Sequence, residues 1–261
     1  MPAQTSVLNH ELDGQGPSIV LLHPVGLDLT FLAPVAAILR KEFTVLTVDQ
    51  RGHGKSPASA PAHSLVDYAD DVHAVLARFA LAPAAVVGFS FGGMVAQELA
   101  LKYPQDVSAL VICASRDSFP PVVRDIARAR GDDARQRGMS DVLEATLDRW
   151  FTPAFRADGK DDAAKARLLS GDVEGWAQAW HAMAAVDTAA RLRNVRAPTL
   201  CLAGELDKSS PPDVVKDMAA AIPGARYAEL AGAPHMLFLE QPEATARVVG
   251  DFLRDVLKPP G

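Results

Sequence analysis

The pentapeptide GFSFG at residues 88–92 constrains the fold more than any other part of the sequence. It follows the apolar, β-branched run AAVV and precedes the helix-like stretch GMVAQELAL. A serine between a strand and a helix in this pattern lies on a tight turn, where the flanking glycines relieve side-chain clashes. The hydroxyl then projects above the sheet. Ser90 is therefore a candidate nucleophile, and the alternative is a serine that only caps a helix.

Short apolar runs alternate with longer helix-like stretches, which predicts a mostly parallel α/β sheet. The runs are SIVLLH, FTVLTVD, AAVVGF, ALVICA and PTLCLAG. Between them, LVDYADDVHAVLARF and MVAQELALKY have the apolar spacing of amphipathic helices. At the start of the chain, residues 6–12 and 18–23 flank DGQGP, whose Gly and Pro residues favour a hairpin-type connection. We expect an antiparallel edge there, ahead of the parallel strands.

The sequence changes character over residues 119–191. Apolar β-branched runs are absent, and helical patterns such as MSDVLEATLDRWF and WAQAWHAMAAV replace them. The run APTLCLAG then resumes the strand pattern. We therefore expect one hydrophobic core formed by residues 1–118 and 192–261, with a helical cap inserted at 119–191. A chain of 261 residues that is 49% hydrophobic is long enough to bury such a core.

A serine nucleophile needs a base within hydrogen-bond reach, and the base needs a group that holds its tautomer. His235 lies in GAPHM, after the strand-like RYAEL, and Asp207 lies in AGELDKSSPP, just after TLCL. Both positions predict loops at the carboxyl edge of the sheet, and the chain order is serine, acid, histidine. Asp117, after ALVICAS, is the alternative acid. Asp207 and His235 could otherwise be a turn aspartate and a solvated loop histidine.

Stabilising an oxyanion requires two N–H donors aimed at the reacting carbonyl. The nucleophile turn directs the N–H of Phe91 toward that position, and the second donor is expected after an early strand, within HPVG. Pro24 has no N–H, so we expect Val25 to be the donor. His23 and His53 are predicted to have structural roles.

Composition and charge exclude several other functions. The formal net charge of -6 and the lack of basic runs leave no surface for nucleic acid. No segment approaches the roughly 18 apolar residues of a membrane span, and the first residues lack a secretion signal, so we expect a cytoplasmic protein with no membrane partner. Cys113 and Cys201 lie in strand-like runs and are predicted to be buried free thiols. The sequence has no HExxH motif or Cys/His spacing, so we expect no metal and no cofactor.

Together LLHPVGLD, VDQRGHGKS, GFSFGGMVAQELA, AGELD and GAPHM resemble the α/β-hydrolase superfamily over essentially the whole chain. The resemblance implies the α/β-hydrolase fold, with a mostly parallel eight-stranded sheet, helices on both faces and a helical cap insertion. The stretches GMSDVLEATLDRWFTPAF and VDTAARLRNVRAPTL are similar to the 3-oxoadipate enol-lactonase group, which implies a role in aromatic degradation. For that group the resemblance implies a triad of Ser90, Asp207 and His235 and oxyanion donors at Val25 and Phe91.

The same resemblance implies a cap that contacts the substrate. An enol-lactone of this kind carries a carboxylate, for which Arg149 offers a bidentate partner and Trp150 an apolar wall. The alternative is a solvated arginine beside a tryptophan of the cap core. The stretch GWAQAWHAM departs from the lactonase pattern because it places large side chains where smaller ones are expected. Among these, Trp180 is our third candidate for a substrate contact.

These observations predict a serine hydrolase that opens a small ester or lactone through an acyl-enzyme. The same triad also serves a carboxylesterase, a hydrolase of carbon–carbon bonds in diketones, or a cofactor-free perhydrolase. A ligand-binding receptor with a hydrolase fold is the alternative outside the enzymes. The exact substrate, the mobility of the cap and the oligomeric state, with a homodimer as one option, stay open.

Overall fold

The structure is a computed structural model and describes residues 8–58 and 64–257. Within these ranges one sheet of seven strands has the order β1-β3-β2-β4-β5-β6-β7. The first strand is antiparallel to its neighbour and all other pairs are parallel, as predicted. The strands are β1 (His10–Asp13), β2 (Ser18–Leu22), β3 (Thr44–Val48), β4 (Ala84–Phe89), β5 (Val107–Cys113), β6 (Thr199–Gly204) and β7 (Arg226–Leu230).

Two expectations about the sheet are wrong for the described residues. The sheet has seven strands there and not eight, and β1 pairs with β3 and not with β2. Both edges of β2 are occupied by the parallel strands β3 and β4, so DGQGP cannot be a hairpin. Gly14 and Gly16 instead let the connection pass close to the backbone at Phe43 and Glu42, where a Cβ atom would lie 2.2 and 2.3 Å from carbonyl oxygens. Residues 6 and 7 of the predicted segment lie outside the described residues.

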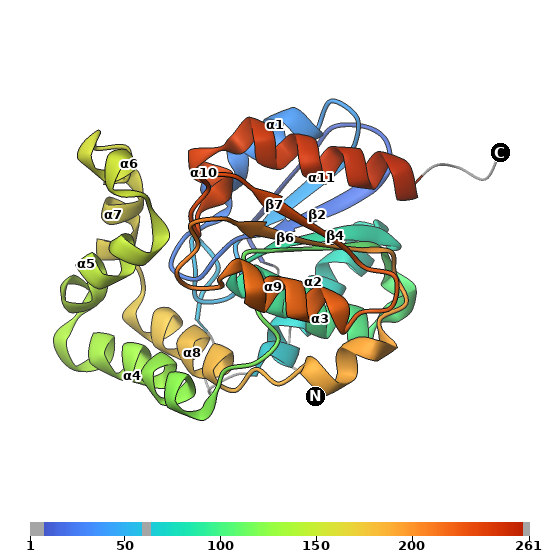
Figure 1. The fold of residues 1–261 in the computed structure, drawn as a ribbon. Helices are drawn as coiled ribbons and strands as arrows, with labels where there is room; N and C mark the ends of the chain where they lie inside the picture. The colour runs from blue at the N-terminus through green and yellow to red at the C-terminus, as the bar shows by residue number, and fades with distance from the viewer. Residues whose placement is uncertain (1–7, 59–63, 258–261) are drawn as a thin grey trace.

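Helices cover both faces of the sheet (Figure 1). The helices α1 and α11 lie on one face, and α2, α3 and α9 lie on the other. Helix α3 is buried over most of its length, because it packs against β4 and β5 beneath α2. The helices and turns outside the segment from α4 (Pro121–Arg137) to α8 (Val173–Ala184) are α1 (Ala33–Leu39), α2 (Leu65–Arg78), α3 (Phe91–Lys102), α9 (Pro212–Ala220), α10 (Leu237–Glu240), α11 (Pro242–Val256) and the 3-10 turns η1 (Leu29–Leu32), η2 (Pro104–Asp106) and η3 (Ala189–Asn194).

Five helices between β5 and β6 lie together beside the sheet (Figure 1). The ends of this segment meet, because Ser118 and Asp187 form an antiparallel bridge and the N–H of Thr188 donates to the carbonyl of Asp117 at 2.9 Å. On this arrangement we propose that residues 119–191 form a cap between the two parts of the core. The cap helices are α4 (Pro121–Arg137), α5 (Met139–Trp150), α6 (Pro153–Ala157), α7 (Asp162–Leu169) and α8 (Val173–Ala184).

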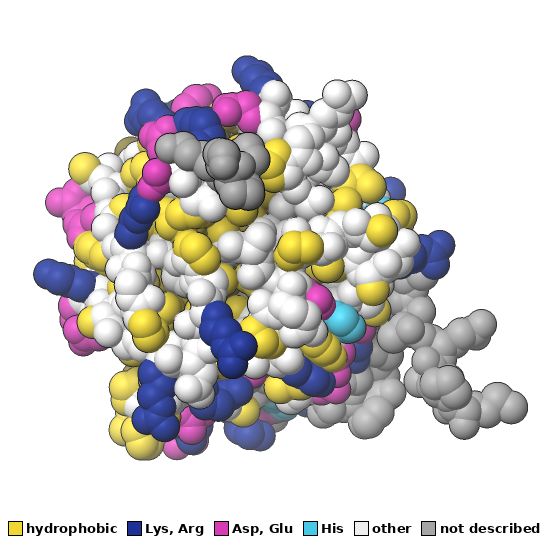
Figure 2. Space-filling model, turned by 90° about the vertical axis from the view of Figure 1, so that its right-hand side faces the viewer, with side chains coloured by type: hydrophobic (Ala, Val, Ile, Leu, Met, Phe, Trp, Pro, Cys, Tyr) yellow, Lys and Arg dark blue, Asp and Glu magenta, His cyan; other side chains and the backbone are white. Residues whose placement is uncertain are grey.

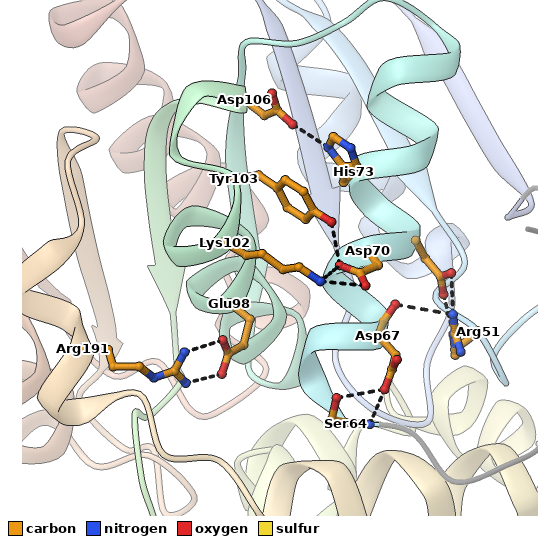
Figure 3. A network of polar contacts seen from close by, with 11 residues as sticks. Arg51, Ser64, Asp67, Asp70, His73, Glu98, Lys102, Tyr103, Asp106 and Arg191 are labelled. Carbon is orange, nitrogen blue, oxygen red and sulfur yellow. Dashed lines mark hydrogen bonds and ion pairs between the residues drawn. The ribbon is translucent and has the colours of Figure 1, made fainter. Parts of the chain in front are cut away.

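A surface network ties α3 to its neighbours (Figure 3). Asp70 on α2 accepts hydrogen bonds from the ammonium of Lys102 at 2.6 and 2.9 Å and from the hydroxyl of Tyr103 at 2.9 Å. The guanidinium of Arg191 in η3 holds both carboxylate oxygens of Glu98, at 2.9 and 2.5 Å. The carboxylate of Glu98 is largely buried, which limits screening of this pair by water. Helix α3 is therefore fixed from two sides.

The surface away from the cap helices carries charges of both signs. Figure 2 shows Lys and Arg side chains interspersed with Asp and Glu on this face. In the part of the chain that the structure describes, no helix has the length and apolarity needed to cross a bilayer. Cys113 and Cys201 are buried free thiols, as predicted. Burial raises the pKa of the Cys113 thiol, so this group is an unreactive core residue.

Candidate active site

Ser90 occupies the turn between β4 and α3 in a backbone conformation that is rare for a side-chain-bearing residue. Its φ is 52° and its ψ is -111°. The turn is compact enough that only glycine fits on either side. A Cβ atom on Gly88 would lie 2.2 Å from the carbonyl oxygen of Gly92, and one on Gly92 would lie 2.3 Å from that of Leu22. Backbone strain of this kind is common at functional sites, where the surrounding fold holds the residue in place.

The structure brings Ser90, His235 and Asp207 together from three separate loops. The Nε2 atom of His235 lies 2.9 Å from the hydroxyl oxygen of Ser90, and its Nδ1 atom lies 2.8 Å from Asp207 Oδ2. The other oxygen of Asp207 accepts the backbone N–H groups of Ser209 and Ser210, at 2.7 and 2.9 Å. Because both oxygens of Asp207 have donors, the carboxylate is held in one orientation and fixes the imidazole.

Asp117, the alternative acid, is placed differently. Its side chain accepts a hydrogen bond from the hydroxyl of Ser118 at 3.0 Å, and its backbone carbonyl accepts from Thr188. The carboxylate that contacts the imidazole of His235 belongs to Asp207. Both aspartates follow strands at the carboxyl edge of the sheet, so the choice between them is made by the loop after β6, which turns toward His235.

Val25 and Phe91 are the two predicted oxyanion donors. Val25 lines the same cavity as Ser90 and His235. Phe91 is the first residue of α3, where a backbone N–H has no acceptor within its own helix. The side chain of Phe91 is fully buried, so its N–H is anchored by the core. We propose that these two N–H groups form the oxyanion hole.

His23 and His53 are buried neutral side chains beneath the site. His23 donates from Nδ1 to the carbonyl of Pro24 at 2.7 Å, and its Nε2 accepts the backbone N–H of Gln50 at 3.0 Å. Burial lowers the pKa of His23 to about 4. Burial, followed by repulsion from His23, lowers the pKa of His53 to about 3. With both ring nitrogens of His23 in use, this residue cannot serve as a second base.

A cavity of about 550 Å³ opens above Ser90 and lies between the core and the cap helices. The predicted substrate contacts Arg149, Trp150 and Trp180 all line it together with the nucleophile and the base. Trp150 and Trp180 are 3% and 6% exposed, so each also packs in the cap core. The volume suits a small organic substrate. Among the described residues, no group of three or more His, Cys, Asp or Glu is arranged to hold a metal ion.

Sequence reasoning missed two further arginines in this cavity, Arg116 and Arg130. Arg130 on α4 lines the wall together with Arg149, and its guanidinium lies 4.7 Å from the ring centroid of Trp180. Helix α4 carries several arginines within RDIARARGDDAR, and the pattern does not show which of them faces inward. The glycine that follows Arg130 indicates the inward direction only in the folded structure. A Cβ atom on Gly131 would lie 2.9 Å from the carbonyl of Ala177, so α4 and α8 make their close contact there.

Comparisons with known proteins identify the family of the fold. A model of the family described as alpha/beta hydrolase fold matches residues 17–242, which confirms the predicted fold class. The chain is 26% identical over 250 residues to 3-oxoadipate enol-lactonase 2 of Acinetobacter baylyi, covering 94% of this chain and 92% of the relative. The crystal structure of the enol-lactonase from Burkholderia xenovorans LB400 is 31% identical with a TM-score of 0.89, covering 94% of this chain and 96% of that one. A thermophilic esterase from Thermogutta terrifontis is 28% identical with a TM-score of 0.91, covering 96% and 94%.

Proposed function

Because the chain belongs to the alpha/beta hydrolase fold family and is a hydrolase of ester or lactone bonds, we propose that it opens a small carboxylate-bearing lactone through an acyl-enzyme. The observation that carries this proposal is the continuous hydrogen-bonded chain from Ser90 through His235 to Asp207, at the floor of a cavity with arginine in its wall. Relatives of similar identity include enol-lactonases and an esterase. The choice of a lactone over an acyclic ester is therefore part of the proposal.

Acylation begins at the contact between Ser90 and His235. The Nε2 atom takes the hydroxyl proton as the serine oxygen forms a bond to the lactone carbonyl carbon. The imidazole then carries a positive charge, which the carboxylate of Asp207 stabilises across the 2.8 Å contact at Nδ1. The N–H groups of Val25 and Phe91 donate hydrogen bonds to the negatively charged carbonyl oxygen, and each donor stabilises it by about 3 kcal/mol.

The tetrahedral intermediate collapses by breaking the ring carbon–oxygen bond. His235 returns its proton to the expelled oxygen, which stays tethered to the acyl group because the substrate is cyclic. The same imidazole next removes a proton from water, and the hydroxide attacks the acyl carbon. Ser90 then leaves and takes the proton back from His235. Each proton moves between Nε2 of His235 and the oxygen of Ser90, the expelled substrate group or water, so no external acid is needed.

The substrate contacts follow from the walls of the cavity. Arg149 is partly buried, and burial lowers the pKa of its guanidinium without removing its charge. A substrate carboxylate compensates this charge with two parallel hydrogen bonds. Trp150 and Trp180 supply apolar walls for the ring and its carbon chain. Loss of turnover on a carboxylate-bearing lactone in Arg149→Ala, at unchanged turnover of a neutral ester, supports this assignment. Equal loss on both substrates contradicts it.

Two measurements test the proposed function. Ser90→Ala is expected to remove essentially all turnover, and a fluorophosphonate is expected to label Ser90 stoichiometrically in the parent protein. A substrate panel of 3-oxoadipate enol-lactone, p-nitrophenyl esters and a vinylogous diketone then ranks the bond types by kcat/KM. Turnover retained by purified Ser90→Ala protein refutes the nucleophile, and a preference for the diketone refutes the lactone.

A carboxylesterase is the second candidate, supported by the similarity to the esterase from Thermogutta terrifontis. The steps at Ser90 and His235 are the same for an acyclic ester, except that the alcohol leaves after protonation. The two candidates differ in the panel. A higher kcat/KM for acyclic carboxylate-bearing esters than for the enol-lactone favours the esterase.

A further inference from the structure

Two guanidinium groups face the cavity without an anionic partner. Neither Arg130 nor Arg149 forms an ion pair or a side-chain hydrogen bond with any residue in the described ranges. Both are partly buried. Partial burial weakens the hydration of a charge, so an unpaired cation there lowers the stability of the empty protein. Such an arrangement is retained where a ligand supplies the missing charge.

The two groups also repel each other. Burial is the main cause that lowers the pKa of Arg130, to about 9, and the charges of Arg149 and then Arg116 lower it further. The side chain therefore stays protonated at neutral pH and remains in an unfavourable field. No carboxylate contributes to the field at Arg130.

The third arginine of the cavity wall is placed differently. Arg116 donates to the carbonyl oxygen of Ser209. Burial lowers its pKa, and the negative charges of Asp207, Asp117 and Asp213 partly oppose this shift. At the mouth, Lys208 and Asp217 are exposed groups of opposite sign. Carboxylates therefore contribute to the field at Arg116, whereas none contributes at Arg130 or Arg149, which both lie on cap helices.

The position of Arg130 is built into the cap. Its carbonyl oxygen accepts the indole N–H of Trp176 at 3.2 Å, and the next residue, Gly131, is where α4 touches α8. Its guanidinium stacks over Trp180, which orients a flexible side chain at a low entropic cost. The indole nitrogen of Trp180 is buried and has no acceptor among the described residues, so the same wall also holds an unused donor.

We propose that Arg130 and Arg149 form a two-guanidinium subsite, and that the substrate carries two carboxylates, one for each arginine. This inference rests on the proposed function, because it places both carboxylates on the acyl compound that Ser90 attacks. It narrows the substrate class from carboxylate-bearing lactones to those with two free carboxylates, one more than 3-oxoadipate enol-lactone carries. It also makes Arg130 a specificity residue contributed by α4. A single carboxylate leaves one of the two cations uncompensated.

Binding of matched ligands tests this directly and needs no turnover. Succinate, glutarate and adipate are each compared by calorimetry with the half-amide of the same length, which has one charge fewer. The tightest dicarboxylate is expected to bind about tenfold or more tightly than its half-amide, the effect of one charge-assisted hydrogen-bonded contact. Inorganic phosphate serves as a compact anion. Equal binding of a dicarboxylate and its half-amide, or tighter binding of phosphate than of every dicarboxylate, overturns the proposal.

Arginine variants identify the groups responsible. Arg130→Gln and Arg149→Gln are each expected to reduce the preference for the dicarboxylate to about twofold or less. Arg128→Gln, on the exposed side of the same helix, is the matched control and is expected to keep it. A preference that persists in Arg130→Gln overturns the role of this residue.

Stability and chemistry are measured separately from binding. Arg130→Gln is expected to unfold at the same temperature as the parent protein or higher, because a repulsive charge is removed. If Arg130→Gln does not fold, Arg130→Lys keeps the charge without the planar fork and is expected to retain only part of the preference. Hydrolysis of neutral p-nitrophenyl acetate in the parent and in Ser90→Ala tests the proposed function. Equal hydrolysis of this ester by the parent protein and Ser90→Ala would contradict the proposed function, whereas equal binding of a dicarboxylate and its half-amide would contradict only the two-guanidinium subsite.

Discussion

The backbone N–H of Met236 donates to the carbonyl oxygen of Trp150 at 3.0 Å. The residue after the base is thereby joined to the residue after Arg149. A second contact lies beside it, because both carboxylate oxygens of Glu240 accept from Thr152, one from the backbone N–H at 2.7 Å and one from the hydroxyl at 2.8 Å. The segment that carries the imidazole is therefore hydrogen-bonded to the end of α5 and to the start of α6.

The first prediction concerns this connection. In Glu240→Gln one oxygen becomes an amide donor, so one of the two donors of Thr152 loses its acceptor. We expect the free energy of unfolding to fall by about 1–3 kcal/mol. We also expect KM for a carboxylate-bearing substrate to rise more than KM for a neutral ester. Urea unfolding and steady-state kinetics measure both, and Glu243→Gln, exposed at the start of α11, is the control. A loss of stability equal to that of Glu243→Gln contradicts the prediction.

The second prediction separates the two candidate acids. Asp207→Asn keeps the shape of the side chain but removes the charge next to Nδ1 of His235, and we expect kcat to fall about 10⁴-fold. Asp117→Asn can still accept from the hydroxyl of Ser118, and its carbonyl contact with Thr188 is unchanged. We expect it to lose less than about tenfold. Measuring kcat for ester hydrolysis by both purified variants tests which aspartate is the acid of the triad. Similar losses of kcat in the two variants would contradict the assignment to Asp207.

The third prediction concerns the nucleophile turn. In Gly92→Ala the new methyl group would lie 2.3 Å from the carbonyl oxygen of Leu22, which is backbone and cannot move aside. We expect a loss of about 3 kcal/mol in stability together with a loss of activity. Gly250→Ala in α11 is the matched control, because its methyl group would meet its nearest atoms at 3.4 Å or more. That variant should be neutral or up to about 1 kcal/mol more stable. Thermal unfolding of the pair checks the contrast.

The fourth prediction follows from the two buried histidines. The pKa of each falls from 6.5 in the unfolded chain, to about 4 for His23 and about 3 for His53. Between pH 6.5 and 4 the unfolded state therefore binds more protons than the folded state, so stability decreases as the pH is lowered. Each group contributes on the order of 3 kcal/mol to this loss.

Urea unfolding at several pH values between 7.5 and 4 measures the slope, and His53→Gln isolates one group. The variant should show a flatter dependence over this range and should differ little in slope above pH 7. An unchanged slope in His53→Gln would mean that His53 is already protonated in the folded protein or does not titrate in the unfolded one.

Local sequence patterns were sufficient to place Ser90, Asp207 and His235 in one site. In a parallel sheet the loops after successive strands emerge at the same edge, so residues just after strand-like runs are brought together by topology alone. The glycines around Ser90 mark a turn that few other sequences can form. The class of fold could also be predicted locally, because helices and strands each have a characteristic spacing of apolar residues.

Pairings between distant segments were harder to predict from the sequence. The connection DGQGP has the composition of a hairpin, but β3 lies between β1 and β2. The strand β3 begins more than twenty residues later in the chain, and no local pattern predicts this pairing. Arg130 was missed for a related reason. Its direction depends on where α8 contacts α4, which is a tertiary relationship. Gly131 marks this contact only once the partner helix is known.

The hydrogen-bonded chain of the candidate site comes from loops that follow β4, β6 and β7, whereas the unpaired arginines come from α4 and α5. The two groups of residues belong to separate stretches of the gene. Laboratory evolution can therefore randomise one stretch while leaving the other intact. Libraries confined to α4, α5 and α8 should yield enzymes with new acyl preferences, and libraries at the loop residues should mostly yield inactive protein.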